Sequence, residues 1–273
     1  MSRSPRLVLL TVPLVLALAA TSPSWAGRDS KRPTHRARSN ATLVAVPRGQ
    51  PVQIAFAAAL NLPAFEPSIA NAIRMAVDAH PAIRGFPIQI NLVNAPCGDS
   101  LADVVAAMSI TANLQNVGVL GQFCSTGFDQ ALPVYESAGI VTLSGSATND
   151  ALPSFGPTVF NRTTVDDDTF EWWYATVSQL PSDLEWQQAF ALEFGAAPSA
   201  FAGLYYDAAS LLIRDLQRVS TVDVGAKLIV SRAALASAVR NTTAYQGVSC
   251  TITLDPSTGN RLDDPAALRR CAG

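Results

Sequence analysis

Short apolar segments alternate with segments of helical periodicity along most of this chain, and this alternation limits the folds that it can adopt. The apolar segments cover residues 52–59, 86–93, 117–121, 140–143 and 158–161. Helical patterns lie between the first four of them, over about residues 67–77, 99–115 and 127–137. Strands that are connected through helices pair in parallel, and both faces of such a sheet need cover. The sequence therefore predicts an α/β fold with a three-layer parallel sheet of Rossmann-like type.

Several predicted elements carry recognisable boundary residues. Ser68 follows Pro67 at the start of one helix and is a plausible N-cap, and Asp99 or Ser100 has the same role before the next helix. Gly85 predicts the turn that leads into the strand at 86–93. From residue 166 the pattern changes to helices, and the last predicted strand runs over residues 248–254. Four helices are expected in this half, over residues 169–179, 184–194, 199–218 and 232–241.

The N-terminus predicts export. Arg3 and Arg6 precede an apolar run over residues 7–20, and Ser24-Trp25-Ala26 has the small residues of a cleavage site, so residues 1–26 are expected to be a cleaved signal peptide. An uncleaved anchor is the alternative, although the run is shorter than the roughly 20 residues that span a bilayer. Residues 27–45 are polar and basic and predict a disordered linker, which leaves residues 46–273 as the folded domain. We expect a secreted or periplasmic protein.

The four cysteines predict disulfide bonds, because an exported chain meets an oxidising compartment and the cysteines lack the paired spacing of zinc sites. Three pairings are possible. We favour Cys97 with Cys124, which would join loops after neighbouring strands, and Cys250 with Cys271 near the C-terminus. Free buried thiols are the alternative.

Charge and motifs exclude several classes of function. A formal net charge of −2 lacks the basic excess typical of nucleic-acid binding. Only His35 and His80 could serve as a catalytic histidine, and one lies in the linker and the other at a helix end. No nucleotide-binding loop, nucleophile elbow or zinc-protease motif occurs. We expect no enzyme, no cofactor and no metal.

The loops after two strands carry hydroxyl groups that could bind a small molecule. GQFCSTG spans residues 121–127, and LSGSATND spans residues 143–150. Backbone N–H groups and hydroxyls at the carboxyl ends of parallel strands approach small anions closely. The alternative is that these Ser and Thr residues only cap helices and fill turns.

Together these segments resemble the type I periplasmic substrate-binding proteins of the branched-chain amino acid (leucine/isoleucine/valine) transport family. The resemblance covers residues 52–168 and 186–261 and is carried by motifs in family order. These motifs are CGDSLADVVAAMSI, GQFCSTG, LSGSATND, FNRT, FALEFGAAPSAFAGLYYDAASLL and YQGVSCTITLDPSTGNR.

The resemblance implies a set of ligand-binding residues. In that family the first lobe holds the carboxylate and ammonium of an amino acid through a serine after the disulfide cysteine and through the next loop. These residues correspond here to Ser125, Ser146, Ala147 and Thr148, with Thr126 as a secondary candidate. The implied function is binding of an amino acid or similar small polar ligand for uptake with an ABC permease or for sensing.

The chain departs from the family after the FNRT strand. Members continue into a second lobe, whereas here only about residues 166–183 separate that strand from the helix expected at 184–194. We therefore expect a fold truncated to essentially one lobe, with a short helical bridge in place of the second. A different function follows as the alternative: a single-lobe interaction protein that has lost its ligand and docks a partner or forms a homodimer through the exposed face.

Three further groups have competing interpretations. The Asp166–Asp168 run could bind a metal, but consecutive carboxylates also suit a helix N-terminus, which we favour. Trp172, Trp173 and Tyr174 could stack on a ligand, but packing over apolar surface is the commoner role. Tyr205, Tyr206 and Asp207 lie in a predicted helix whose apolar spacing suits the core.

Overall fold

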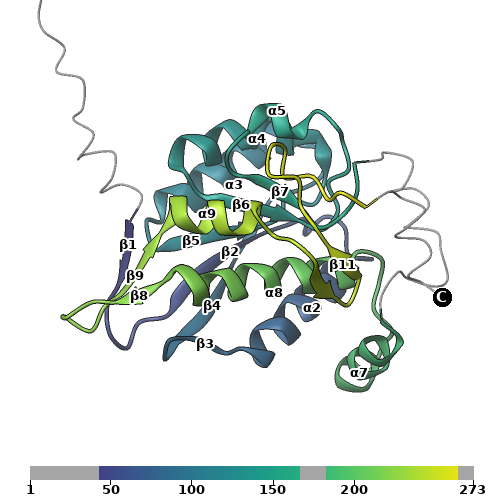
Figure 1. The fold of residues 1–273 in the computed structure, drawn as a ribbon. Helices are drawn as coiled ribbons and strands as arrows, with labels where there is room; N and C mark the ends of the chain where they lie inside the picture. Colours follow the sequence, from purple (N-terminus) through teal and green to yellow (C-terminus); the bar gives the residue numbers. More distant parts are fainter. Residues whose placement is uncertain (1–42, 167–182, 264–273) are drawn as a thin grey trace, which may run out of the picture. The chain divides into compact units, whose positions relative to one another are not determined.

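A parallel sheet forms the centre of the computed structural model, which describes residues 43–166 and 183–263 within one compact unit (Figure 1). The strands, in spatial order, are β3 (Ala82–Ile83), β4 (Phe86–Asn94), β2 (Val52–Ala58), β5 (Asn116–Leu120), β6 (Val141–Ser144) and β7 (Phe160–Arg162). Only β3 runs antiparallel to its neighbour, and it reaches β4 through a turn at Arg84 and Gly85 with φ of 50° and 87°. The predicted α/β class and parallel sheet are confirmed.

Helices cover both faces of this sheet (Figure 1). On one face α2 (Glu66–Ala79) packs against α8 (Ala202–Val219), and on the other α3 (Ser100–Ala112) packs against α4 (Ser125–Ala138). The remaining helices are α5 (Leu152–Phe155), α7 (Leu184–Phe194) and α9 (Arg232–Arg240). Each face of the sheet has its own apolar cluster, so the chain forms the three layers expected of an α/β fold.

One predicted helix cap is confirmed and another is wrong. The Asp99 side chain accepts a hydrogen bond from the Ala102 N–H at 3.0 Å and caps α3. Ser68 instead lies inside α2, which begins at Glu66, and its hydroxyl accepts a bond from the Ser199 N–H at 2.8 Å. Proline at the second helical position needs no N–H partner, which lets α2 begin before Ser68.

The apolar residues of α3 do not all face the core. Leu101, Val105 and Met108 are 74%, 57% and 57% exposed. The buried face consists instead of Ala106, Ala107 and other residues. Small alanine side chains let α3 approach its neighbours closely, and this leaves the larger side chains on the outside.

Two small sheets complete the described chain. β1 (Leu43–Val46) pairs with β9 (Leu228–Ser231), which also pairs with β8 (Thr221–Val222). Ordered structure therefore begins inside the segment 27–45 that was predicted as a linker, because the alternating burial of β1 places two valines in the core.

The predicted strand at 248–254 is shorter than expected and does not join the main sheet. β11 (Cys250–Ile252) pairs only with β10 (Tyr245–Gly247) in an antiparallel hairpin. The outer edge of β7 is covered instead by a turn, in which the Gly259 carbonyl accepts the Arg162 N–H at 3.1 Å. Covering an edge in this way protects it from pairing with other chains.

The predicted disulfide between Cys97 and Cys124 is present and joins the loops after β4 and β5. The side chain of Asn61 also fixes the loop after β4, since it forms hydrogen bonds with both the N–H and the carbonyl of Cys97. Cys250 is also disulfide-bonded. Its predicted partner Cys271 lies outside the described residues, so that pairing stays a prediction.

Replacing Cys97 and Cys124 together by serine is expected to lower the free energy of unfolding by about 3 kcal/mol, because the bond closes a loop with a sequence separation of 27. Urea titration followed by circular dichroism measures the change. Equal midpoints for the two proteins would contradict a stabilising role for this bond.

Other predictions fall on residues that the structure does not describe. These are the signal peptide at 1–26, most of the segment 27–45, the helix at 169–179 and the aromatic residues Trp172, Trp173 and Tyr174. Among the described residues, no helix has both the length and the apolar character needed to cross a bilayer.

Candidate ligand-binding site at the carboxyl ends of β5 and β6

The two hydroxyl-bearing loops lie side by side at one edge of the sheet. They leave the carboxyl ends of β5 and β6, which are adjacent parallel strands paired through Leu120 and Leu143. Along the chain, β2 is followed by β4, which lies on one side of β2, and then by β5, which lies on its other side. The order of the strands therefore reverses between β2 and β5, and this position is a switch point of the sheet. Ligands of open α/β sheets bind outside the strand ends at such a point.

Ser125 connects the two loops directly. Its hydroxyl oxygen accepts hydrogen bonds from the N–H groups of Thr148 and Asn149, both at 3.1 Å. The sequence-predicted residues Ser125 and Thr148 are therefore in contact, but these two amide groups already have a partner. The hydroxyl proton of Ser125 has no acceptor among residues 43–166 and 183–263, and the residue is half-buried. Ser125 can thus donate one further hydrogen bond.

Ser146 and Ala147 face the interior. The Ser146 hydroxyl donates to the Phe123 carbonyl at 2.7 Å and shares a 3.1 Å hydrogen bond with the Tyr205 hydroxyl. The Ala147 N–H donates to the Ser144 hydroxyl at 3.1 Å. Both residues are at most 1% exposed, so they shape the loop from inside. Thr126 is the exposed member of the predicted set.

Arg162 holds the second loop and was not among the predicted site residues. Its Nη1 donates to the carbonyls of Ala147 and Asn149, both at 3.0 Å. Nε and Nη2 both donate to the Asn260 side-chain oxygen, at 2.9 and 2.7 Å. Arg162 is fully buried, and its position directly after the short strand predicted at 158–161, the edge strand β7 in the structure, was the available signal for its role.

Aromatic side chains fill the interior beside the switch point. Phe123 lies between Phe65, Phe201 and Tyr205, with ring centroids 5.3–6.4 Å away. Burial raises the pKa of Tyr205 to about 12, so its hydroxyl stays protonated. The adjoining hollow between Phe56, Phe123 and α2 has no room for a water molecule. This hollow therefore cannot hold a ligand.

Asp103 is a second residue that sequence reasoning missed. Its side chain points from α3 toward Gly127, where a Cβ would lie 1.9 Å from the carboxylate and where φ is +94°. The residue is 2% exposed, and burial, followed by the charges of Asp99 and Asp129, raises its pKa to about 7. A titrating carboxyl group therefore lies against the turn that carries Ser125.

The acidic run at 166–168 is described only at its first residue. The Asp166 carboxylate accepts a hydrogen bond from the Asn260 side-chain amide at 3.0 Å. Asp167 and Asp168 lie outside the described residues, so the predicted helix cap stays a prediction. Within the described ranges, no three acidic, histidine or cysteine side chains gather as metal ligands would.

Comparison with solved structures identifies the fold. A candidate branched-chain amino acid ABC transporter from Rhodospirillum rubrum superimposes with a TM-score of 0.66 at 15% identity, over 78% of this chain and 96% of that one. The chain has the type I periplasmic binding protein fold. An ABC transporter substrate-binding protein from Desulfitobacterium hafniense in complex with Leu matches at a TM-score of 0.63 and 14% identity, over 79% of this chain and 96% of that one.

A third protein with the type I fold binds a different class of ligand. A solute-binding protein from Rhodopseudomonas palustris BisB5, in complex with 3,4-dihydroxy benzoic acid, has a TM-score of 0.59 at 13% identity, over 78% of this chain and 90% of that one. No family model matches the sequence, and no curated protein matches it significantly. Because the matched spans take in most of each neighbour, they do not by themselves support the loss of a lobe, which stays a prediction.

Proposed function

We propose that this type I domain is an exported solute-binding protein that recognises an amino acid or a similar small polar ligand for ABC-type uptake or sensing. The observation that carries the proposal is the direct contact of Ser125 with the Thr148–Asn149 turn, beside the switch point of the sheet. The structural neighbours, whose names describe ABC transport or solute binding, support the same class of function. The predicted signal peptide supports export.

Ser125 supplies the central contact of the proposed site. Its hydroxyl proton is suited to a carboxylate oxygen, and the exposed Thr126 hydroxyl can add a second bond. Ser146, Ala147 and Thr148 act by holding the turn that positions Ser125. An open site on one lobe stays wet, so we expect dissociation constants weaker than about 10 μM.

Replacing Ser125 by alanine is expected to weaken ligand binding at least tenfold, because a hydrogen bond to a charged group contributes about 1.5 to 3 kcal/mol. Isothermal calorimetry with the standard amino acids measures it. Ser137→Ala is the matched control, since its hydroxyl bonds the Pro133 carbonyl on the same helix and lies away from the site. Thr126→Ala tests the site without disturbing the Ser125 contacts with the second loop.

Several results would contradict the proposal. These are equal heats for the wild type and Ser125→Ala with any amino acid that binds, or no heat from any amino acid. Circular dichroism of each variant separates loss of binding from loss of folding.

The interaction-protein alternative has its own support. Ser146 and Ala147 are buried by the protein's own side chains, and α3 exposes Leu101, Val105 and Met108 on its outer face. Large exposed apolar side chains close together are typical of interaction surfaces. A concentration-dependent dimer in light scattering, together with the absence of ligand heats, would favour this alternative.

A further inference from the structure

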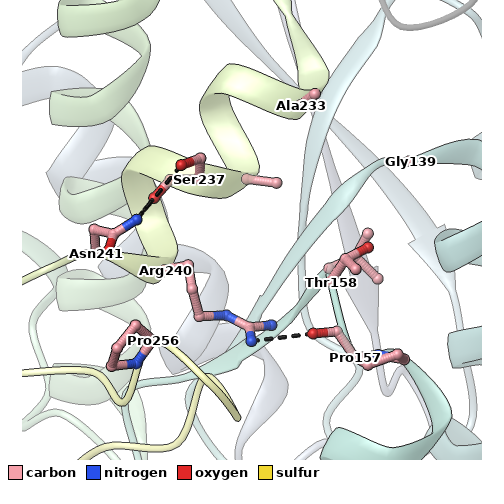
Figure 2. A pocket seen from close by; sticks show the side chains of 10 residues that line it. Gly139, Pro157, Thr158, Ala233, Ser237, Arg240, Asn241 and Pro256 are labelled. Carbon is pink, nitrogen blue, oxygen red and sulfur yellow. Dashed lines mark hydrogen bonds between the residues drawn. The ribbon is translucent and has the colours of Figure 1, made fainter.

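A cavity of about 400 Å³ (Figure 2) is lined by residues at the end of the sheet opposite to the carboxyl ends of β5 and β6. Gly139 and Val159, which line it, precede β6 and β7, so the cavity lies at the amino ends of these strands. Helix α9 forms one wall, and the segment 157–159 forms another (Figure 2). Its volume falls within the range of small-molecule sites, which is about 300 to 1,000 Å³.

Arg240 is the charged group of this cavity and extends from α9 toward Pro157 (Figure 2). The residue is 7% exposed. Its guanidinium donates to the side-chain oxygen of Asn161 at 2.9 Å and to the carbonyls of Pro157 and Phe160 at 3.1 and 2.6 Å. A guanidinium has five N–H donors, so two remain beyond these bonds.

No carboxylate in the described part of the chain lies within 4.0 Å of this guanidinium. The nearest acidic groups, Glu136 and Asp255, favour the charged form of Arg240, whereas burial lowers its pKa. Both acids have other partners. Glu136 accepts bonds from the N–H and hydroxyl of Thr158, and Asp255 accepts bonds from Ser257. Arg240 is therefore a buried cation paired only with neutral acceptors, and such a cation attracts an anion.

The other lining groups restrict which anion fits. Ser237 accepts a hydrogen bond from the Asn241 side chain at 3.4 Å and can donate its own proton into the cavity. The remaining wall is largely apolar, with Pro157, Val159, Ala233, Ala236 and Pro256. Thr158 and Asn241 also line the cavity, but the Thr158 hydroxyl donates to Glu136 and the Asn241 amide donates to Ser237. The guanidinium and the Ser237 hydroxyl beside an apolar wall therefore suit a single carboxylate on a compact apolar body, whereas inorganic phosphate would leave that wall without contacts.

We infer that this cavity is a binding site for a small organic monocarboxylate, held by Arg240 and Ser237 and independent of the solute site proposed above. The carboxylate accepts the remaining guanidinium N–H groups, and the apolar body contacts Ala233, Ala236 and Val159.

Benzoate is the probe, and benzamide is its neutral analogue of the same shape. The protein without residues 1–26 is titrated with each compound, and binding is measured from the changes in its NMR chemical shifts. Ala233→Leu fills the cavity from an exposed position, and Ala234→Leu, exposed on the same helix but outside the cavity, is the matched control. We expect saturable benzoate binding that Ala233→Leu weakens at least tenfold and Ala234→Leu leaves unchanged. Benzamide should bind at least tenfold more weakly than benzoate.

Arg240→Met should also abolish benzoate binding, but this variant loses three structural hydrogen bonds. The test therefore depends on the comparison of Ala233→Leu with Ala234→Leu. Equal benzoate affinity in Ala233→Leu and the wild type would overturn the inference, as would the absence of saturable binding. Binding that is lost in Ser125→Ala but kept in Ala233→Leu would place benzoate at the solute site and would likewise overturn it. Failure of the amino acid titrations does not affect this result, because they test the opposite edge of the sheet.

Discussion

Asp103→Asn is expected to be more stable than the wild type at alkaline pH, by about 4 kcal/mol in the free energy of unfolding. Burial raises the pKa of Asp103 from 3.8 to about 7, and one pKa unit corresponds to about 1.4 kcal/mol. The folded protein therefore holds this proton between pH 4 and 7 while the unfolded chain has released it. Stability from this group is fully present below pH 4 and is lost as the pH rises through 7.

Urea titrations at pH 4, 6 and 8.5 measure the difference. Asparagine keeps the shape of the protonated carboxyl group, so the two proteins should be nearly equal at pH 4 and should diverge as the pH rises. Asp78→Asn, which removes an exposed carboxylate from α2, controls for the loss of one negative charge. A constant difference between wild type and Asp103→Asn across this range would refute the buried titration.

Gly259→Ala is expected to lower the free energy of unfolding by about 4 kcal/mol. At this residue φ is +76°, and a Cβ would lie 2.1 Å from the Phe160 carbonyl oxygen. The left-handed conformation costs alanine about 1 kcal/mol, and forced displacement of packed backbone adds about 3 kcal/mol. The backbone around Phe160 also bonds Arg240, so it cannot move away easily.

Gly195→Ala is the matched control for this prediction. Gly195 ends α7 with a φ of +74°, nearly that of Gly259, but no atom lies within 4 Å of its hypothetical Cβ. It should cost only about 1 kcal/mol. Thermal unfolding of both variants separates the two contributions. Equal losses of stability would mean that the contact with the Phe160 carbonyl adds no cost at residue 259.

The five parallel strands of the central sheet were predictable because each coincides with a short, mainly apolar run between turn residues, whereas the two-residue strand β3 was not predicted. β2 and β4 follow the predicted segments to within a residue, since strands buried on both faces need apolar residues throughout. The disulfide Cys97–Cys124 was predicted correctly, because its cysteines follow parallel strands whose carboxyl ends lie on the same side of the sheet. The expectation that these two strands are neighbours was wrong, since β2 lies between β4 and β5.

The candidate site was only partly predictable. The approach of Ser125 to Thr148 follows from the strand order, which brings the two loops together. Arg162 and Asp103 were not assigned roles. The position of Arg162 beside a predicted strand was a signal, but the residue types arginine and aspartate do not by themselves indicate burial. The exposed side of α3 was also unexpected, since apolar spacing does not reveal which face packs on the sheet.

The sequence by itself determined the layered α/β class, the parallel sheet and the loops that meet at its carboxyl edge, because these depend on local periodicity and chain order. Only the tertiary structure decided which polar groups are buried and which remain accessible. Asp207 illustrates the point: from within α8 it accepts the N–H groups of Val248 and Ser249, both at 2.8 Å, some 40 residues further along the chain. Burial and pairing of this kind depend on long-range contacts, and local residue patterns do not encode them.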